Sequence, residues 1–287
     1  MNINDIKKSA KTMVSFEVFP PKTKPSVESL FDTIENLKLA DPTFISVTYG
    51  AGGSGTDQSV RIASRIKSEF DIEPLAHLTC VGADRSHMLS VLDDMKSNEI
   101  LNILALRGDI PVGMDVKSAF ADFSYATDLI DLISEKGGMY TMAAAYPEGH
   151  PQSTSAKEDI TYLKMKQDKG VSRFNTQLCF NTDTILRFLD DSKNAGITVP
   201  MSIGVMPILN PNQILRMVSL SGCSIPTDLA KLFALYGKND KDFRRVGLDY
   251  ATNQVERLLD HGIDGLHLYT MNKYTASLQI LSDVGLI

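Results

Sequence analysis

The sequence lacks most of the features that mark secreted, membrane-spanning or nucleic-acid-binding proteins. Its three cysteines, Cys80, Cys179 and Cys223, are odd in number and far apart, which argues against a disulfide framework and a structural zinc site. No apolar run approaches the roughly 18 residues of a membrane span, and the N-terminal 1–19 lacks the apolar region of a signal peptide. The net charge of −6 argues against nucleic acid or an anionic membrane as the main partner. We therefore expect a cytoplasmic protein.

Common catalytic and metal-binding motifs are missing as well. The sequence contains no G-x-S-x-G, H-E-x-x-H or Walker A pattern. Cys80 and Cys179 lie in apolar segments typical of a core. The five histidines show no metal-ligand spacing. We expect neither cysteine catalysis nor a metal site.

The chain is instead built from short apolar segments that alternate with amphipathic ones. Strands are predicted at 12–19, 43–49, 73–81, 101–107, 140–146, 173–180, 200–206 and 265–270. Between them the spacing i, i+3, i+4, i+7 predicts helices, for example over 26–40, 59–70, 84–98 and 125–137, with extra helix over roughly 211–261. Alternating strands and helices indicate a parallel sheet. Eight such units without a linker favour one α/β domain over 1–287, a (β/α)₈ TIM barrel.

Polar residues gather where the predicted strands end, which is where the catalytic residues of such a barrel lie. These ends carry Glu17, Thr48, His77, Arg107, Gly108, Asp109, Tyr146 and Gln177. A purely structural barrel would not require polar groups at so many strand ends. The pattern therefore indicates an enzyme.

Glu17 is the main candidate for acid–base chemistry. It lies in "FEVFPPKT" beside Phe16 and Phe19, and an apolar setting raises a carboxyl pKa, as a general acid requires. An outward-facing glutamate on a strand is the alternative.

Other polar residues also have two interpretations. His77 could be a core histidine, and Arg107 with Asp109 could close a turn as an ion pair. Asp159 and Lys166 fall on one face of a predicted helix, where they could hold a ribose and a phosphate or form a solvated charged face.

The stretch "SVTYGAGGSG" matches the G-x-G-x-x-G spacing of a Rossmann turn through Gly50, Gly52 and Gly55. It follows the second predicted strand rather than the first, and no doubly wound half surrounds it. We therefore interpret it as a barrel loop that passes close to a cofactor.

Six motifs occur in one order along the chain: "SFEVFPPKT", "SVTYGAGGS", "HLTC", "ALRGD", "AAYPEGHP" and "TQLCF". Together they resemble the methylenetetrahydrofolate reductases of the single-domain bacterial type. The resemblance implies a TIM barrel that binds FAD, takes a hydride from NADH or NADPH and reduces 5,10-methylenetetrahydrofolate to 5-methyltetrahydrofolate. It also implies a homo-oligomer and no regulatory domain.

The resemblance assigns roles to individual residues. Glu17 matches the general acid at folate N10, and Asp109 matches an aspartate near both flavin and pterin. Positions that match FAD contacts are Thr48, Tyr49, Ala51, His77, Arg107, Gly108, Asp109, Ala126, Tyr146, His150, Asp159 and Lys166. Folate contacts besides Glu17 and Asp109 are implied at Gln177, Gln213 and Lys273.

The chain departs from the family pattern at three positions that concern binding. Lys273 stands where an arginine is expected, Ile203 where proline often precedes Gly204, and Tyr162 where asparagine is common. Two alternative functions stay open: a pterin-binding barrel methyltransferase, and a flavin- or folate-binding subunit of a larger complex.

Overall fold

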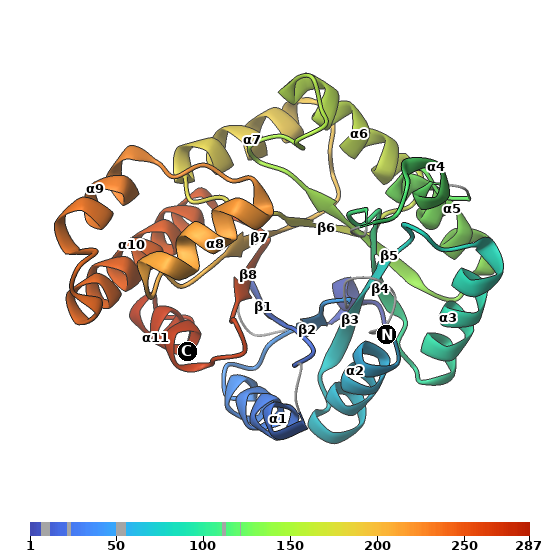
Figure 1. The fold of residues 1–287 in the computed structure, drawn as a ribbon, viewed down its shortest axis with the longest axis horizontal. Coiled ribbons are helices and arrows are strands. Elements are labelled where there is room, and N and C mark those ends of the chain that lie inside the picture. Colours follow the sequence, from blue (N-terminus) through green and yellow to red (C-terminus); the bar gives the residue numbers. More distant parts are fainter. Residues whose placement is uncertain (7–11, 22–23, 50–55, 111–112, 121) are drawn as a thin grey trace.

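The computed structural model describes residues 1–6, 12–21, 24–49, 56–110, 113–120 and 122–287. Eight parallel strands form a closed barrel in which each strand pairs with the next and the last pairs with the first (Figure 1). They are β1 (Met13–Val18), β2 (Phe44–Val47), β3 (Glu73–Thr79), β4 (Asn102–Leu106), β5 (Tyr140–Ala145), β6 (Arg173–Thr176), β7 (Met201–Val205) and β8 (Gly265–Tyr269). The predicted barrel and its strand order are therefore confirmed. Several strands are shorter than predicted, because their last residues leave the sheet and form the loops that carry the polar groups.

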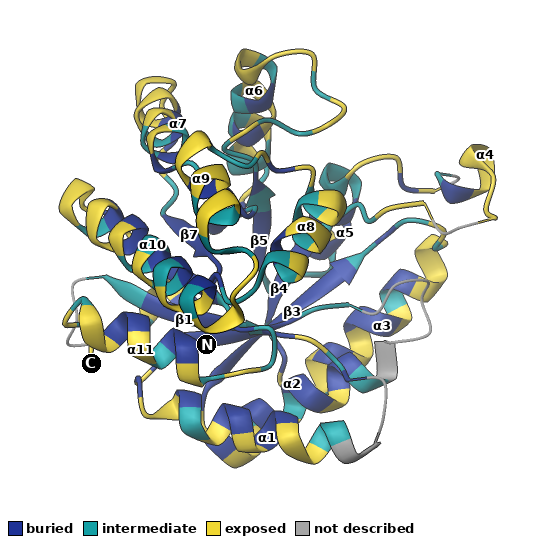
Figure 2. Cartoon of the chain, turned by 60° about the vertical axis from the view of Figure 1, so that its left-hand side comes forward, coloured by how far each residue is buried: buried dark blue, intermediate teal, exposed yellow. Residues whose placement is uncertain are grey.

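Helices surround the barrel and turn their apolar sides toward the strands, while their outer sides are exposed (Figure 2). They are η1 (Ile3–Asp5), α1 (Lys24–Lys38), α2 (Thr56–Phe70), α3 (Arg85–Ser97), α4 (Val116–Ala119), α5 (Ala126–Lys136), α6 (Ala156–Asp168), α7 (Thr182–Asn194), α8 (Pro211–Ser221), α9 (Thr227–Tyr236), α10 (Asp240–His261) and α11 (Thr275–Asp283). The extra helix predicted over 211–261 is thus three helices, α8 to α10. None of the described helices is long and apolar enough to cross a membrane.

Polar side chains lie at both ends of the barrel interior, but they differ in their hydrogen bonds. Near the N-terminal ends of the strands an apolar cluster made up of Ile3, Phe44, Leu75, Leu104 and Met142 lies beside buried Asn102 and Arg173, whose side chains are hydrogen-bonded within the protein. Closer to the C-terminal ends the buried polar residues are Ser15, Ser46, His77, Asn175 and His267, and both amide atoms of Asn175 lack a partner among the described residues. Polar groups inside a barrel cost free energy unless they are partnered. The unpartnered amide therefore points to the C-terminal end as the functional end.

A separate apolar cluster supports one side of this end. Ile208 and Ile214 of the β7–α8 region pack with Leu229 of α9 and Phe243 of α10. This packing fixes α8 beside the mouth of the barrel, where Leu220 and Ser221 border a cavity.

Candidate active site

Two adjoining cavities lie at the C-terminal ends of the strands. The outer cavity, about 420 Å³, is bordered by α5 and α6. The mouth cavity, about 340 Å³, lies over the barrel interior and contains Glu17. Both are bordered by Arg107, Tyr146 and His150. The cavities are therefore neighbours that share a wall, and each has a volume typical of small-molecule sites.

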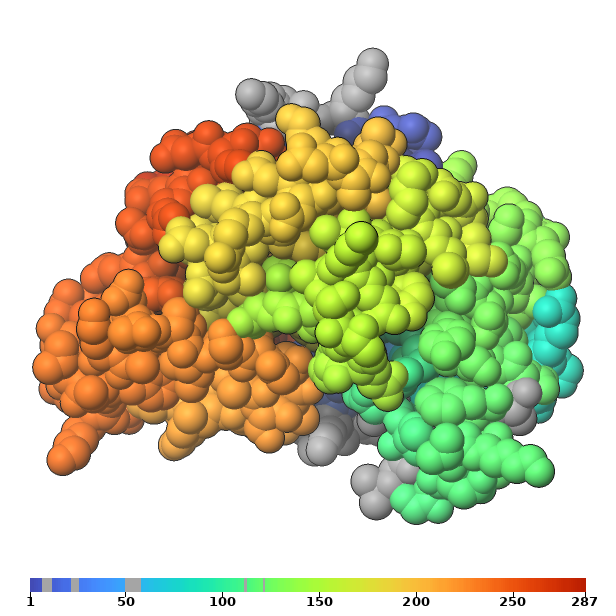
Figure 3. All heavy atoms as spheres, turned by 90° about the horizontal axis from the view of Figure 1, so that it is seen from above, coloured from blue at the N-terminus to red at the C-terminus, as the bar shows by residue number. Residues whose placement is uncertain are grey.

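A contact joins the loop after β5 to the segment between α8 and α9. Glu148, in the loop after β5, accepts hydrogen bonds from the backbone N–H of Ser224, at 3.1 Å, and from its hydroxyl. Figure 3 shows this loop, in yellow-green, lying against the orange segment that contains α8 and α9. The two loops together form part of the rim.

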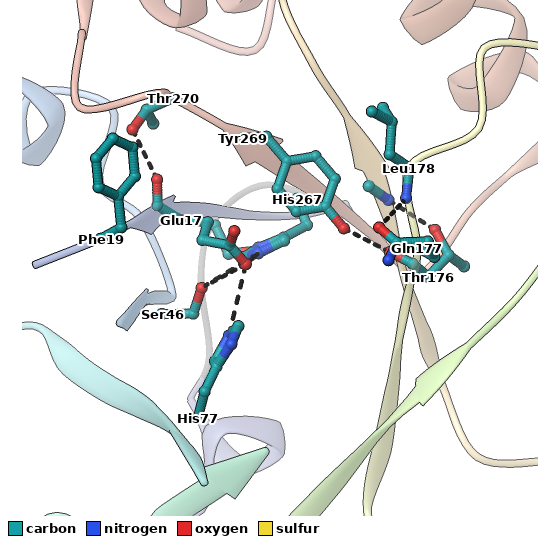
Figure 4. A network of polar contacts seen from close by, with 12 residues as sticks. Glu17, Phe19, Ser46, His77, Thr176, Gln177, Leu178, His267, Tyr269 and Thr270 are labelled. Atoms are coloured by element: carbon teal, nitrogen blue, oxygen red, sulfur yellow. Dashed lines mark hydrogen bonds and ion pairs between the residues drawn. The ribbon is translucent and has the colours of Figure 1, made fainter. Parts of the chain in front are cut away.

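Glu17 lies within a cluster of polar side chains from four strands (Figure 4). Its Oε2 is 3.5 Å from the Ser46 hydroxyl, which donates to it, 3.5 Å from His77 Nε2 and 3.7 Å from His267 Nε2. The other ring nitrogen of His267, Nδ1, is hydrogen-bonded with the Ser15 hydroxyl at 2.8 Å, which fixes the orientation of the ring. Strand pairing explains the arrangement, because Ser46 is the β2 partner of Glu17.

These polar neighbours lower the pKa of the Glu17 carboxyl, whereas the sequence predicted a raised pKa. Burial raises its pKa, but the hydrogen bond with His267, the charge interactions with both histidines and the Ser46 hydroxyl together lower the pKa below its ordinary value. The prediction of a raised pKa is wrong for the ligand-free chain. Phe16 and Phe19 are its neighbours only along the sequence, whereas barrel closure supplies polar ones. Burial also lowers the pKa of His77, while the Glu17 carboxylate opposes that shift.

Replacing His267 with leucine is expected to raise the pKa of Glu17, because the hydrogen bond that lowers it is lost. A carboxyl with a lowered pKa in the folded state stabilises the fold above its unfolded pKa, and this contribution fades as the pH falls through the folded pKa. The variant should therefore lose part of its stability at neutral pH. NMR titration of labelled glutamate measures the shift.

His261→Leu is the matched control, because His261 lies on α10 near Asp190, 3.4 Å away, and not near Glu17. It should leave the pKa of Glu17 unchanged. An unchanged Glu17 pKa in His267→Leu would contradict the assigned interaction.

The outer cavity is bordered by two charged residues of α6, the buried Asp159 and the half-buried Lys166. Asp159 accepts hydrogen bonds from the backbone N–H of His150 at 3.1 Å and from the Ser153 hydroxyl at 2.5 Å, so it fixes the loop before the helix. Lys166 donates to the Ala144 carbonyl at 2.9 Å, and burial lowers the pKa of its amine to about 8. The predicted shared helix face is confirmed, and it faces the cavity instead of solvent.

Arginine and aromatic side chains also border the outer cavity. Arg107 donates to the side-chain oxygen of Gln152, and the rings of Tyr146 and His150 pack edge to face with centroids 4.8 Å apart. Burial raises the pKa of the Tyr146 hydroxyl. Arg107 and Lys166 therefore offer positive charge to an anionic ligand, while Tyr146 stays neutral.

The structure brings most of the sequence-predicted residues to these cavities. Those bordering the mouth cavity alone are Glu17, Thr48, His77, Gly108, Asp109 and Gln177. Those bordering the outer cavity alone are Ala126, Asp159 and Lys166. Tyr162, the departure from the family pattern, also borders the outer cavity, and its hydroxyl donates to Glu158 at 2.9 Å.

Three predicted residues that the structure describes do not border either cavity. Tyr49 packs partly buried against the main core. Gln213, at the start of α8, has its amide nitrogen 3.8 Å from the sulfur of Met206. Lys273 is exposed after β8. Ala51 lies outside the described residues, as do the glycines of the "GAGGSG" stretch.

Sequence reasoning did not single out Ser15, Ser46, Asn175 or His267. A usable signal was present, because polar residues alternate along individual strands, as in Arg173-x-Asn175-x-Gln177 of β6. Alternate residues of a strand point to one face, so this pattern indicates a polar barrel interior.

Residues 2–285 match the protein family described as methylenetetrahydrofolate reductase. The chain belongs to this family. A bacterial relative, 5,10-methylenetetrahydrofolate reductase of Escherichia coli, is 35% identical over 272 residues that cover 95% of this chain and 90% of the relative. Methylenetetrahydrofolate reductase (NADH) 1 of Arabidopsis thaliana is 38% identical, covering 99% of this chain and 50% of the relative. This methylenetetrahydrofolate reductase family member thus spans about half the length of its plant relatives.

A solved structure shares the fold of this family member. It is an uncharacterised protein from Clostridium thermocellum that binds two copies of 5-methyl-5,6,7,8-tetrahydrofolic acid. The two chains align with a TM-score of 0.66 and 17% sequence identity, over 96% of this chain and 95% of the other. At this identity the likeness concerns the fold alone.

Proposed function

We propose that this chain reduces 5,10-methylenetetrahydrofolate to 5-methyltetrahydrofolate, with FAD as bound cofactor and NADH or NADPH as electron donor. The observation that carries the proposal is the pair of adjoining cavities, one with the half-buried Glu17 carboxyl and one with the half-buried cations of Arg107 and Lys166. The pterin ring of a folate suits the mouth cavity, and an elongated dinucleotide suits the outer cavity.

The residues of the outer cavity fit FAD. Lys166 has a carbonyl partner but no carboxylate within ion-pair distance in the described chain, so its charge and that of Arg107 can neutralise a diphosphate. At the mouth cavity, both polar atoms of Asn175 are buried without a hydrogen-bond partner among the described residues. Such atoms suit the polar edge of a ring. When bound, FAD supplies the hydride chemistry, while the protein supplies position and electrostatics.

Glu17 is the proton donor in this proposal. Its proton forms the N10–H bond as the bond between N10 and the methylene carbon breaks, and the electron pair of that bond stays on N10. The resulting N5 iminium accepts one hydride at the methylene carbon, which becomes the methyl group. One proton and one hydride thus account for the product.

Glu17 must carry a proton when folate is bound, although its pKa is lowered in the ligand-free chain. A ligand in the mouth cavity excludes water from the carboxyl, and desolvation favours the neutral form. We infer that the carboxyl takes up its proton on ligand binding, with Ser46 and His267 keeping it oriented toward the cavity.

The decisive experiment is an anaerobic flavin titration. The purified protein loaded with FAD should be bleached by NADH or NADPH, and the bleached protein should be reoxidised by methylenetetrahydrofolate with formation of 5-methyltetrahydrofolate. Protein that cannot be loaded with FAD would end the proposal. Flavin reduction without reoxidation by the folate would favour a subunit that acts within a larger complex.

Affinity for FAD is expected to fall as the pH rises above about 8. The Lys166 amine loses its proton near that pH in the ligand-free chain, whereas an anionic diphosphate favours the charged form. Affinity should therefore be constant below pH 8 and then weaken by up to about tenfold for each pH unit. Quenching of flavin fluorescence on binding measures the affinity.

Lys166→Arg should bind FAD independently of pH in this range, and Lys166→Gln should bind weakly at every pH. Lys164→Gln is the matched control on the same helix, because Lys164 pairs with Asp168 at the surface. A wild-type pH profile in Lys166→Gln would contradict the role of the amine.

A further inference from the structure

Asn175 is a buried residue at the border of the mouth cavity, and its carboxamide has no partner among the described residues. It lies in β6, is 5% exposed and borders the cavity together with Ala144 and Gln177. Both Oδ1 and Nδ2 are buried, and neither has a hydrogen-bond partner among the residues that the structure describes. Buried polar groups are almost always partnered in folded proteins, so an amide without a partner at either end beside a cavity requires an explanation.

The neighbouring strands do not supply the missing hydrogen bonds. The register partner of Asn175 in β5 is Ala144, whose side chain is a methyl group. Its partner in β7 is Ser202, whose hydroxyl accepts from the Arg173 guanidinium at 3.0 Å. Just after β6, the Gln177 side-chain oxygen accepts from the Leu178 backbone N–H at 2.8 Å. The described strands thus leave both amide atoms of Asn175 unpartnered at the border of the mouth cavity.

We propose that Asn175 binds the lactam edge of a fused pyrimidine ring placed in the mouth cavity. A carboxamide presents one acceptor beside N–H donors, and a ring N–H next to a ring C=O is the complementary pattern. A phosphate or carboxylate would leave the Asn175 oxygen unpaired, and an apolar ring would leave both atoms unpaired. The flavin ring and the pterin ring both carry a lactam edge, so this inference rests on the proposed function and deepens it.

Asn102 provides an internal comparison at the opposite end of the barrel. It is fully buried in β4, and its Oδ1 accepts from the Ile3 backbone N–H at 3.2 Å. Its Nδ2 donates to the Met1 carbonyl at 2.9 Å and to Glu73 Oε2 at 3.3 Å. Both amide atoms of Asn102 therefore have hydrogen-bond partners within the protein, whereas those of Asn175 have none among the described residues.

The test compares Asn175→Leu with Asn102→Leu in the full chain. Removing an amide that has no partner should leave the thermal midpoint of the ligand-free protein unchanged or raise it, since nothing is left unpaired. The same variant should bind FAD or the folate at least tenfold more weakly than wild type does. Asn102→Leu should lower the thermal midpoint and leave both affinities unchanged.

Separate binding arms identify the ring. Loss of FAD affinity measured without folate supports the flavin ring, and loss of folate affinity in FAD-loaded protein supports the pterin ring. Lumazine, a fused lactam ring that carries neither the FAD nor the folate tail, is the third ligand. It tests the role of Asn175 even if the wild-type protein binds neither FAD nor folate. Failure of the wild type to bind FAD and folate would refute only the proposed function. Asn175→Asp, which keeps the side-chain size but loses the donor, replaces the leucine variant if that fails to fold. Binding of FAD, folate and lumazine within twofold of wild type would overturn the inference.

Discussion

A Glu17→Gln variant is expected to lose reduction of methylenetetrahydrofolate while its bound flavin is still reduced by NADH or NADPH at close to the wild-type rate. Glutamine keeps the size of the side chain and an oxygen that can accept from the Ser46 hydroxyl, but it has no acidic proton to give to N10. General acid catalysis contributes about 10²- to 10⁴-fold in rate, so the folate half-reaction should slow by that factor. Stopped-flow absorbance of the flavin follows each half-reaction separately.

Glu73→Gln is the matched control for this prediction. Glu73 is also a buried glutamate of the barrel, but it lies at the N-terminal end of β3, where it pairs with Lys67 and with the N-terminal amine. Its replacement should lower the thermal midpoint and leave both half-reactions unchanged. An equal loss of both half-reactions in Glu17→Gln would contradict the role of proton donor.

The fold could be predicted because its signals are local. Each strand and each helix is a run of fewer than 25 residues with its own period, and the number and order of the runs imply the barrel. The α6 face was predictable for the same reason, since Asp159 and Lys166 are two helical turns apart. Whether this face points toward a cavity could not be predicted, because a helix face that borders a cavity and one exposed to solvent show the same spacing of polar residues.

The environment of Glu17 could not be predicted, because it depends on closure of the barrel. Ser46 and His77 come from the next two strands and His267 from the last one, 250 residues away along the chain. The sequence beside Glu17 contains phenylalanines, so the expected pKa shift had the wrong sign. Polar residues at alternate strand positions indicate a polar interior, but which of them meet depends on the register between strands.

A Gly204→Ala variant is expected to damage both the stability of the barrel and the shape of the mouth cavity. A methyl group at this position of β7 would lie 2.6 Å from the Tyr269 ring and 2.7 Å from the backbone oxygen of Thr176. The Thr176 carbonyl is part of β6, and the Tyr269 hydroxyl donates to it at 2.7 Å, so neither can move without breaking a contact. Tyr269 is the β8 register partner of Glu17, so its displacement also opens the wall beside the proposed proton donor.

Overpacking a dense core costs about 1–3 kcal/mol, and a position with two contacts this short belongs at the upper end of that range. For a chain of this size that corresponds to a fall of about 5 °C in the thermal midpoint, which differential scanning calorimetry measures. Gly265→Ala in the neighbouring strand is the control, since its methyl group would meet nothing closer than 3.0 Å, and there only side-chain atoms. Combining Gly204→Ala with Tyr269→Leu should reduce the loss, because one of the two clashes is removed while the Thr176 carbonyl remains. Strictly additive effects of the two substitutions would show that Gly204 is not required for the placement of Tyr269.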